Sequence, residues 1–188
     1  MNTVEISLAI LKELEGPLKQ IDPDQAEALV DAILCADQVF VAGTGRSQMM
    51  VRGLAMRLMH LGFKAFVVGE TVTPAIEPGD LLIIGSGSGE TSTLAIIANK
   101  AKKVGAKLAL ITIYPESTIG QSADIVIRIP AATTKRGGHS GAKSIQPGAN
   151  MFEQSMLLFC DATVIRIIEK EKIQDSNMIL MKNHANLE

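Results

Sequence analysis

Three hydroxyl side chains and three glycines stand together in one short segment of the chain. In order, the residues are Gly85, Ser86, Gly87, Ser88, Gly89, Glu90 and Thr91. Glycines let the backbone turn tightly, so that amide N–H groups at the start of a following helix can point at an anion, and the hydroxyls add donors around that point. A helix N-cap needs one hydroxyl, whereas this loop has three. No Lys follows the last glycine as in the nucleotide P-loop. The segment therefore predicts a site for a phosphomonoester.

A second, smaller loop earlier in the chain repeats this composition. It reads Gly43-Thr44-Gly45-Arg46-Ser47. We expect Ser47 to cap the helix that follows and to reach the same ligand. Arg46 offers a fixed positive charge to the phosphate. The alternative for Arg46 is an ordinary surface position.

Glu153 is the candidate for proton transfer. Leu157, Cys160, Val164 and Ile167 follow it at helical spacing, so that Glu153 stands at the end of an apolar stripe. Loss of hydration there favours the neutral form of a carboxyl group and raises its pKa towards the range that suits a general base. The alternative is a Glu that complements the helix dipole in the first turn. The spacing alone leaves both readings open.

Other titratable side chains are weaker candidates. Glu90 belongs to the phosphate loop but would repel a dianion, so we expect its carboxylate to point away. His60 lies in an apolar helix and is predicted to be a packed, hydrogen-bonded imidazole. His184 stands four residues from the end of the sequence and could reach a site only by docking, most plausibly on a neighbouring subunit. His139 lies in a long basic segment, 131–150, which either closes over an anion or is a mobile surface loop.

The elements that must hold these loops follow from short apolar runs. Five strands are predicted, at 38–42, 65–68, 81–84, 108–113 and 125–129, and helices are predicted within 1–36 and at 47–61, 91–104 and 151–168. The runs show little polar alternation, as in strands covered on both faces. Alternating strands and helices indicate an α/β fold with a doubly wound, five-stranded parallel sheet. Ligands collect beyond the carboxyl ends of such strands, where both loops fall.

Length and composition exclude several protein classes. The 188 residues suit one domain, with N-terminal helices at 1–36, a core at 37–170 and a C-terminal tail at 171–188. A net charge of −2 and 3% aromatic residues argue against a nucleic-acid platform. No apolar run reaches the roughly 18 residues of a membrane helix. Cys35 and Cys160 stand among apolar residues and are predicted to be buried thiols, so that we expect a cytoplasmic protein.

At the two hydroxyl loops the chain resembles the sugar isomerase (SIS) domain family. That family has a G-x-G-[KR]-S loop after the first strand and an S-x-S-G-x-T loop after the third. Four separated motifs narrow the resemblance to its 6-phospho-3-hexuloisomerase branch. They are Met56 to Phe63, Ile84 to Thr91, Phe152 to Gln154 and His184 to Glu188.

The resemblance implies an isomerase that interconverts 3-hexulose 6-phosphate and fructose 6-phosphate through an enediol, without a metal or other cofactor. It also implies a homotetramer, and a role in formaldehyde fixation through the ribulose monophosphate pathway or in pentose supply. By the resemblance, Ser86 to Thr91 and Ser47 bind substrate and Glu153 accepts the proton. His184 is a further candidate, for a catalytic or a substrate-binding role. Two alternatives stay open: an isomerase of another phosphosugar, and a phosphosugar-sensing domain without catalysis. Arabinose-phosphate isomerases of this fold carry a histidine after the second strand, where this chain reads Thr71 to Ala75, and this weakens an aldose substrate.

Overall fold

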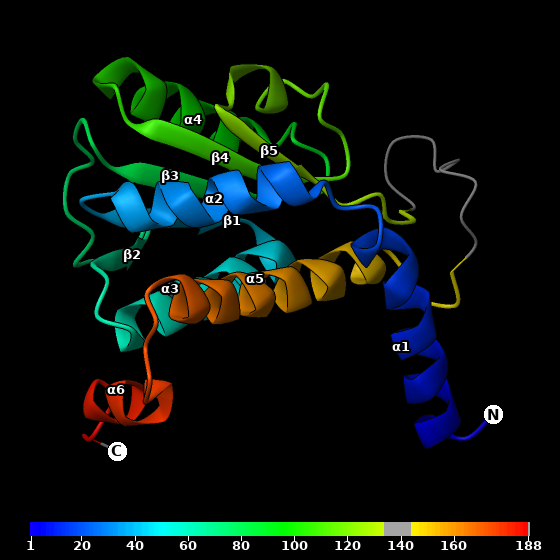
Figure 1. The fold of residues 1–188 in the computed structure, drawn as a ribbon. Helices are drawn as coiled ribbons and strands as arrows, with labels where there is room; N and C mark the ends of the chain where they lie inside the picture. Colours follow the sequence, from blue (N-terminus) through cyan, green and yellow to red (C-terminus); the bar gives the residue numbers. More distant parts are fainter. Residues whose placement is uncertain (134–143, 188) are drawn as a thin grey trace.

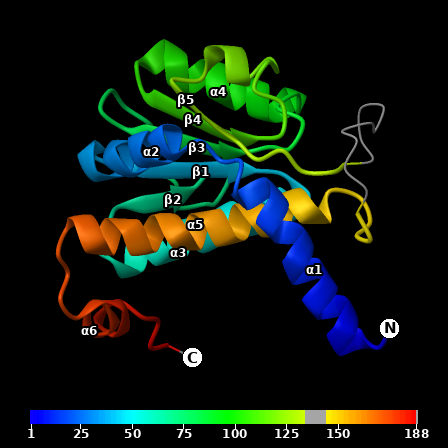
Figure 2. The same ribbon diagram turned by 45° about the vertical axis from the view of Figure 1, so that its right-hand side comes forward.

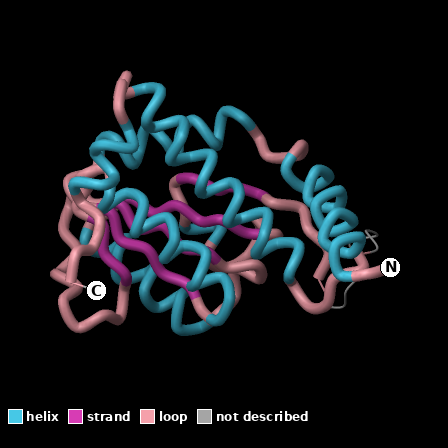
Figure 3. Tube along the Cα trace, turned by 90° about the horizontal axis from the view of Figure 1, so that it is seen from below, coloured by secondary structure: helices cyan, strands magenta, loops and turns pink. Residues whose placement is uncertain are grey.

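Five parallel strands form the centre of the computed structural model, which describes residues 1–133 and 144–187. The strands lie side by side as one layer (Figure 1, Figure 3) in the order β2-β1-β3-β4-β5. Their bounds are β1 Val39–Gly43, β2 Ala65–Val67, β3 Leu81–Gly85, β4 Lys107–Thr112 and β5 Ile125–Arg128. The direction of winding reverses between β1 and β3, and this reversal is where doubly wound sheets bind ligands.

Helices cover both faces of the sheet. Successive residues of a strand point to opposite faces, so that Val39 and Val41 of β1 pack into one hydrophobic cluster and Phe40 and Ala42 into the other. The first cluster is completed by α2 (Pro23–Cys35), α3 (Gly45–His60) and α5 (Asn150–Lys170), and the second by α4 (Ser92–Val104). Burial on both faces explains why these strands read as continuous apolar runs.

Two further helices lie at opposite ends of α5 (Figure 1, Figure 2). Helix α1 (Thr3–Leu18) projects from the body by its N-terminal end, and it packs against the core through Ile10, Leu14 and Leu18. Helix α6 (Ser176–Lys182) follows α5 and has no buried residue. The side-chain amide of Asn183 donates to the carbonyl oxygen of His60, 2.9 Å away, which ties the C-terminal end to α3.

The predicted fold is confirmed, and the strand and main helix bounds agree with it to within two residues. The segment 171–188, predicted as a C-terminal tail, contains α6. One expectation was wrong. Cys35 was predicted to be buried, but it is exposed at the end of α2, whereas Cys160 is buried. Burial, with a smaller effect of Asp161, raises the pKa of the Cys160 thiol to about 12.

Two sequence predictions are not decided by this fold. The division into 1–36, 37–170 and 171–188 stays a prediction. Half of the basic segment 131–150, including Lys135, Arg136, His139 and Lys143, lies outside the described residues. Within the part of the chain that the structure describes, no helix is both long and apolar enough to cross a membrane.

Candidate active site

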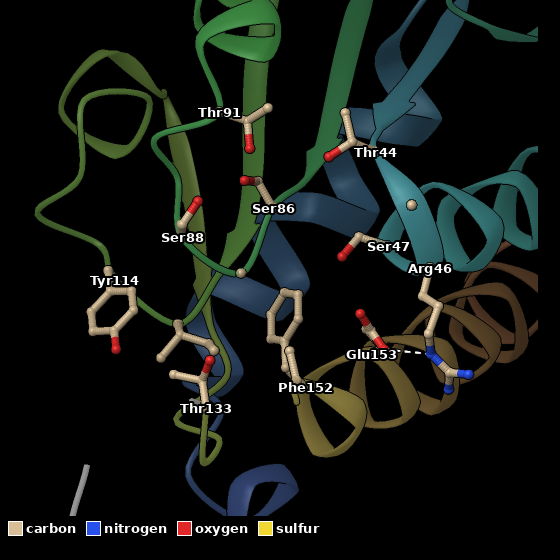
Figure 4. Close-up of a pocket in the computed structure, with 14 residues that line it drawn as sticks. Thr44, Arg46, Ser47, Ser86, Ser88, Thr91, Tyr114, Thr133, Phe152 and Glu153 are labelled. Carbon is tan, nitrogen blue, oxygen red and sulfur yellow. Dashed lines mark hydrogen bonds and ion pairs between the residues drawn. The ribbon is translucent and has the colours of Figure 1, made fainter. Parts of the chain in front are cut away.

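A pocket opens where the loops after β1 and β3 meet the start of α5 (Figure 4). Its lining residues are Thr44, Gly45, Arg46, Ser47, Ser86, Gly87, Ser88, Thr91, Ile113, Tyr114, Thr133, Ala149, Phe152 and Glu153. The cavity measures about 170 Å³. Sites for drug-sized ligands usually measure roughly 300–1,000 Å³, so that this pocket suits a small ligand.

The loop from Ser86 to Thr91 presents its hydroxyls to the pocket (Figure 4). The hydroxyl oxygen of Ser86 accepts from the N–H of Gly89 and that of Ser88 from the N–H of Glu90, each at 3.2 Å. Since both oxygens act as acceptors within the loop, their O–H groups are left to donate to a ligand. Thr91 occupies the N-cap of α4 and makes no side-chain capping bond. The three hydroxyls are therefore arranged to bind an anion.

The loop after β4, residues 113–120, packs against the phosphate loop, which is the segment from Gly85 to Thr91. The N–H of Ile113 and the hydroxyl of Thr112 both donate to the carbonyl oxygen of Gly87, at 3.2 and 3.3 Å. Gly89 has a φ of +62°, and a Cβ added there would lie 1.9 Å from the Oγ of Ser117. Only glycine combines this backbone conformation with so close an approach. The loop is thus fixed before any ligand binds.

Glu90 leaves the phosphate loop in the opposite direction. Its carboxylate accepts from the N–H of Thr118 at 3.0 Å and from the hydroxyl of Thr118 at 2.6 Å. The expectation that Glu90 points away from the anion is confirmed. Neither Glu90 nor Gly89 lines the pocket, although both were counted among the substrate-binding residues. Both hold the loop in place, and their assignment to substrate binding stays a prediction.

Arg46 and Glu153 form an ion pair on the opposite wall. The Nε of Arg46 lies 2.5 Å from the Oε2 of Glu153, and the two side chains are 51% and 12% exposed. In Figure 4 the other carboxylate oxygen of Glu153 points past Ser47 into the pocket. The sequence predicted a Glu153 with apolar surroundings and an Arg46 directed at the anion. The structure instead pairs the two side chains, because α3 and α5 pack side by side and bring their N-terminal turns together.

Ser47 lies inside the first turn of α3 and does not cap it. The N-cap position belongs to Thr44, which makes no side-chain capping bond. The prediction that Ser47 caps the helix was wrong, since the helix begins two residues earlier than expected, at Gly45. Its hydroxyl still lines the pocket, near Glu153 (Figure 4).

Sequence reasoning missed two polar pocket residues, Tyr114 and Thr133. They follow the carboxyl ends of β4 and β5, as the two hydroxyl loops follow β1 and β3. The rule that ligands gather beyond strand ends would have pointed to them. No motif marked either residue.

His184 lies far from this pocket within the same chain. Its ring stacks on that of His60, with ring centroids 5.3 Å apart. His60 is the last residue of α3, whose first turn lines the pocket, and a 16-residue helix is about 22 Å long. The packed imidazole predicted for His60 is confirmed by its 4% exposure. Burial first, and then the nearby charges of Arg57 and His184, lower the pKa of His60.

A metal site does not emerge from the described parts of the chain. Among residues 1–133 and 144–187, no three His, Cys, Asp or Glu side chains gather closely enough to hold a metal ion. The prediction that the chemistry needs no metal and no cofactor stays a prediction.

Comparisons with known proteins point to one family. The family model described as SIS domain matches residues 32–160. A 3-hexulose-6-phosphate isomerase of Bacillus subtilis (strain 168) is 46% identical over 188 residues, which cover 100% of both chains. A 3-hexulose-6-phosphate isomerase of Mycobacterium gastri is 39% identical over 176 residues, 94% of this chain and 86% of that protein.

A solved structure is similar over its whole length. It comes from Methanococcus jannaschii, and the molecular function inferred for it is that of a 3-hexulose-6-phosphate isomerase. It superimposes with a TM-score of 0.83 at 32% sequence identity and covers 98% of this chain and 99% of its own.

Proposed function

The chain belongs to the SIS domain family, and on that premise we propose that it is a phosphosugar isomerase that interconverts 3-hexulose 6-phosphate and fructose 6-phosphate. One observation carries the proposal: three hydroxyls suited to a phosphate and one carboxylate suited to proton transfer line the same small pocket. The full-length similarity to two 3-hexulose-6-phosphate isomerases supports the choice of sugar.

The protein binds its substrate through the phosphate group. The hydroxyls of Ser86, Ser88 and Thr91 surround the end of β3 and the start of α4 (Figure 4). Hydrogen bonds from neutral donors to a charged phosphate are stronger than those between neutral groups, and the partial positive charge of the N-terminus of α4 adds to them. Because the phosphate does not change during the reaction, these contacts bind the ground state and the transition state alike.

Glu153 performs the proton transfer. Starting from the 3-hexulose, its carboxylate removes the proton from C2, next to the C3 carbonyl. The electron pair of the C–H bond forms the C2–C3 double bond, and the π pair of the C3 carbonyl moves onto O3, which takes up the hydroxyl proton of O2 to complete the shift through the enediol. The same carboxyl group then returns its proton to C3, while the electron pair on O2 forms the carbonyl at C2 and the C2–C3 double bond reverts to a single bond. One carboxylate placed over two adjacent carbons suffices for both transfers. The free oxygen of Glu153 points into the pocket as this role requires (Figure 4).

Arg46 and Ser47 complete the wall that carries Glu153. The ion pair with Arg46 occupies the Oε2 of Glu153 and leaves the Oε1 for the sugar. Ser47 lies on the pocket side of the same helix turn, where its hydroxyl can contact the sugar. We assign Ser47 to substrate binding and Arg46 to holding the base.

His184 acts, in this proposal, in the pocket of a neighbouring copy of the chain. Within one chain it lies about the length of α3 away from the pocket. Apolar side chains are exposed on the helices that would meet other copies: Val4, Leu8 and Leu11 on α1, Met49 and Met56 on α3, Ile165 on α5, and Met178 and Met181 on α6. Exposed apolar surface of this kind favours association.

The assembly is tested by light scattering and by subunit complementation. We expect a mass near four times 20.0 kDa, and a monomer at all concentrations would contradict the shared site. Glu153→Gln and His184→Asn chains, each inactive alone, should regain activity when they are refolded together, because hybrid oligomers contain some intact sites. Mixed oligomers that stay inactive would remove His184 from the mechanism.

The reaction is tested with a panel of hexulose, pentulose and aldose phosphates followed by NMR in deuterated water. The expected result is conversion of 3-hexulose 6-phosphate to fructose 6-phosphate, with solvent deuterium entering at the carbon that receives the proton. Turnover of a different phosphosugar would keep the reaction class and change the substrate. Saturable binding of phosphosugars without turnover would contradict the proposed activity and favour a sensing domain.

A further inference from the structure

Glu13, on the N-terminal helix α1, makes a set of contacts that the mechanism above does not use. Its carboxylate accepts three hydrogen bonds from a segment that lies more than 130 residues later in the chain. The donors are the hydroxyl of Ser144 at 2.8 Å, the N–H of Ile145 at 2.8 Å and the side-chain amide of Gln146 at 3.1 Å.

The carboxylate is well held at that position. Glu13 adjoins the buried Leu14 on the part of α1 that packs on the core. Burial by itself would raise the pKa of Glu13, but the hydrogen bonds from Ile145, Ser144 and Gln146 outweigh it and leave the pKa below its usual value. The ionised carboxylate is therefore the form that the fold stabilises.

The anchored segment leads directly into the catalytic helix. From Gln146 the chain turns through Pro147 and Gly148, whose φ is +64°, to Ala149 at the N-cap of α5. Ala149 lines the pocket, and its carbonyl oxygen accepts from the N–H of Glu153 at 3.1 Å. Only Pro147 and Gly148 thus separate the anchored Gln146 from Ala149, which lines the pocket.

The beginning of α5 has no local signal to fix it. Ala149 has no side chain that could cap the helix, and the structure shows no side-chain capping bond there. The N-cap residues of α1, α2 and α6, which are Asn2, Asp22 and Asp175, each accept a capping hydrogen bond. Helices α3 and α4 also lack a side-chain capping bond, but each has a threonine at its N-cap. Where a cap is missing, the position of the first turn depends on contacts made elsewhere.

We propose that Glu13 is a positioning residue for the active site. By anchoring residues 144–146, it fixes the position of Ala149, which lines the pocket, and of the first turn of α5, from which Glu153 reaches the substrate. This inference rests on the proposed function of Glu153 as the base. A base displaced by about 1 Å can lose up to roughly 100-fold in rate. The phosphate loop lies on other elements and is not affected.

The test compares Glu13→Ala and Glu13→Gln with a control, Glu15→Gln. Glu15 lies two residues further along α1 and pairs with Lys19 in solvent. We expect kcat to fall in the order Glu15→Gln, Glu13→Gln, Glu13→Ala, with the last losing between about 3-fold and 100-fold and KM nearly unchanged. Gln keeps one oxygen that can accept from Ile145, so that it should restore part of the activity.

A second measurement, amide hydrogen exchange, reports on the anchored segment and does not require catalysis. Hydrogen exchange at residues 145–153 should be faster in Glu13→Ala than in the wild type and unchanged in Glu15→Gln, while the amides of β1, β3 and β4 keep their protection. A folded Glu13→Ala protein with unchanged kcat, or with unchanged exchange at 145–153, would overturn the inference. If the wild type turned over no phosphosugar, the proposed function would fail, and the exchange experiment alone would decide whether Glu13 fixes this segment.

Discussion

One wall of the pocket is formed by a single short stretch of chain, whereas the opposite wall is assembled from three distant ones. Ser86, Ser88 and Thr91 lie within six residues, and the hydroxyls of Ser86 and Ser88 accept from backbone N–H groups of the same loop. On the other wall, Glu153 depends on Arg46, 107 positions away, and the segment before it depends on Glu13, 131 positions from Ser144. We call Ser86, Ser88 and Thr91 the hydroxyl wall, and Glu153 with Arg46 and the segment before α5 the carboxylate wall. The residues of the hydroxyl wall are close together in the sequence, and those of the carboxylate wall are not.

This difference separates binding from chemistry. The phosphate loop is held by its glycines, by a strand end and a helix start, and by hydrogen bonds to the neighbouring residues 112–118, none of which belongs to the wall that carries Glu153. The carboxylate wall must hold one oxygen over two carbons, and small displacements there cost rate. Substitutions on the hydroxyl wall should therefore change KM, and those on the carboxylate wall should change kcat.

The largest effect is expected for Glu153→Gln. Gln keeps the shape of the side chain but cannot accept a proton at neutral pH, so that kcat should fall by about 10²–10⁴-fold while phosphosugar binding is kept. Calorimetric binding and deuterium exchange measure the two parts separately. Glu171→Gln, at the exposed C-terminal end of α5, serves as the control. A Glu153→Gln protein that retained a tenth of wild-type kcat would assign the proton transfer to another group.

Ser88→Ala and Thr91→Val test the hydroxyl wall. Each removes a donor to a charged phosphate, worth about 1.5–3 kcal/mol, so that KM should rise by roughly 10- to 150-fold with a smaller change in kcat. Initial rates over a range of phosphosugar concentrations give both constants. Ser92→Ala is the matched control, because Ser92 begins α4 but does not line the pocket. A fall in kcat with constant KM would contradict the division between the two walls.

Arg46→Gln decides between two roles for the guanidinium. Arg46 is half exposed, so that its pair with Glu153 is worth only about 1 kcal/mol, and kcat should fall roughly 5-fold with little change in KM. Arg52→Gln is the control. Arg52 lies on the same helix as Arg46 but outside the pocket, and the substitution breaks its ion pair with Glu70. If KM rose instead, Arg46 would bind the phosphate directly, as its sequence position predicted.

The smallest effect concerns His60, the last residue of α3, at the end of that helix remote from the pocket. The pKa of His60 is lowered mainly by burial, so that the folded state favours the neutral ring. Below the ordinary His pKa of about 6.5 the unfolded chain binds a proton that the folded chain resists. Stability should therefore fall as the pH drops from about 7.5 to about 5.5.

Urea unfolding at several pH values checks this expectation. The slope of stability against pH should be smaller in His60→Asn than in the wild type, since the variant lacks the titrating ring. Equal slopes in the two proteins would show that His60 does not contribute to the pH dependence.

The sequence by itself determined the fold and the hydroxyl wall. Strands buried on both faces must be continuously apolar, and a strand end followed by Gly, Ser and Thr indicates an anion site. Each of these two patterns is contained within a few consecutive residues, so that it can be recognised in the sequence. This is why the strand bounds and the pocket positions of Ser86, Ser88 and Thr91 could be predicted. Tyr114 and Thr133 follow the same rule but carry no motif, and they were missed.

Only the tertiary structure decided the surroundings of Glu153. Helical spacing placed it on an apolar stripe but could not show that the first turns of α3 and α5 meet and pair it with Arg46. Likewise, no local pattern connects Glu13 with Ser144, or brings His184 onto His60 at the far end of α3. Such contacts depend on how helices pack across a common core, and the chain positions that they join are too far apart for any local signal to record them.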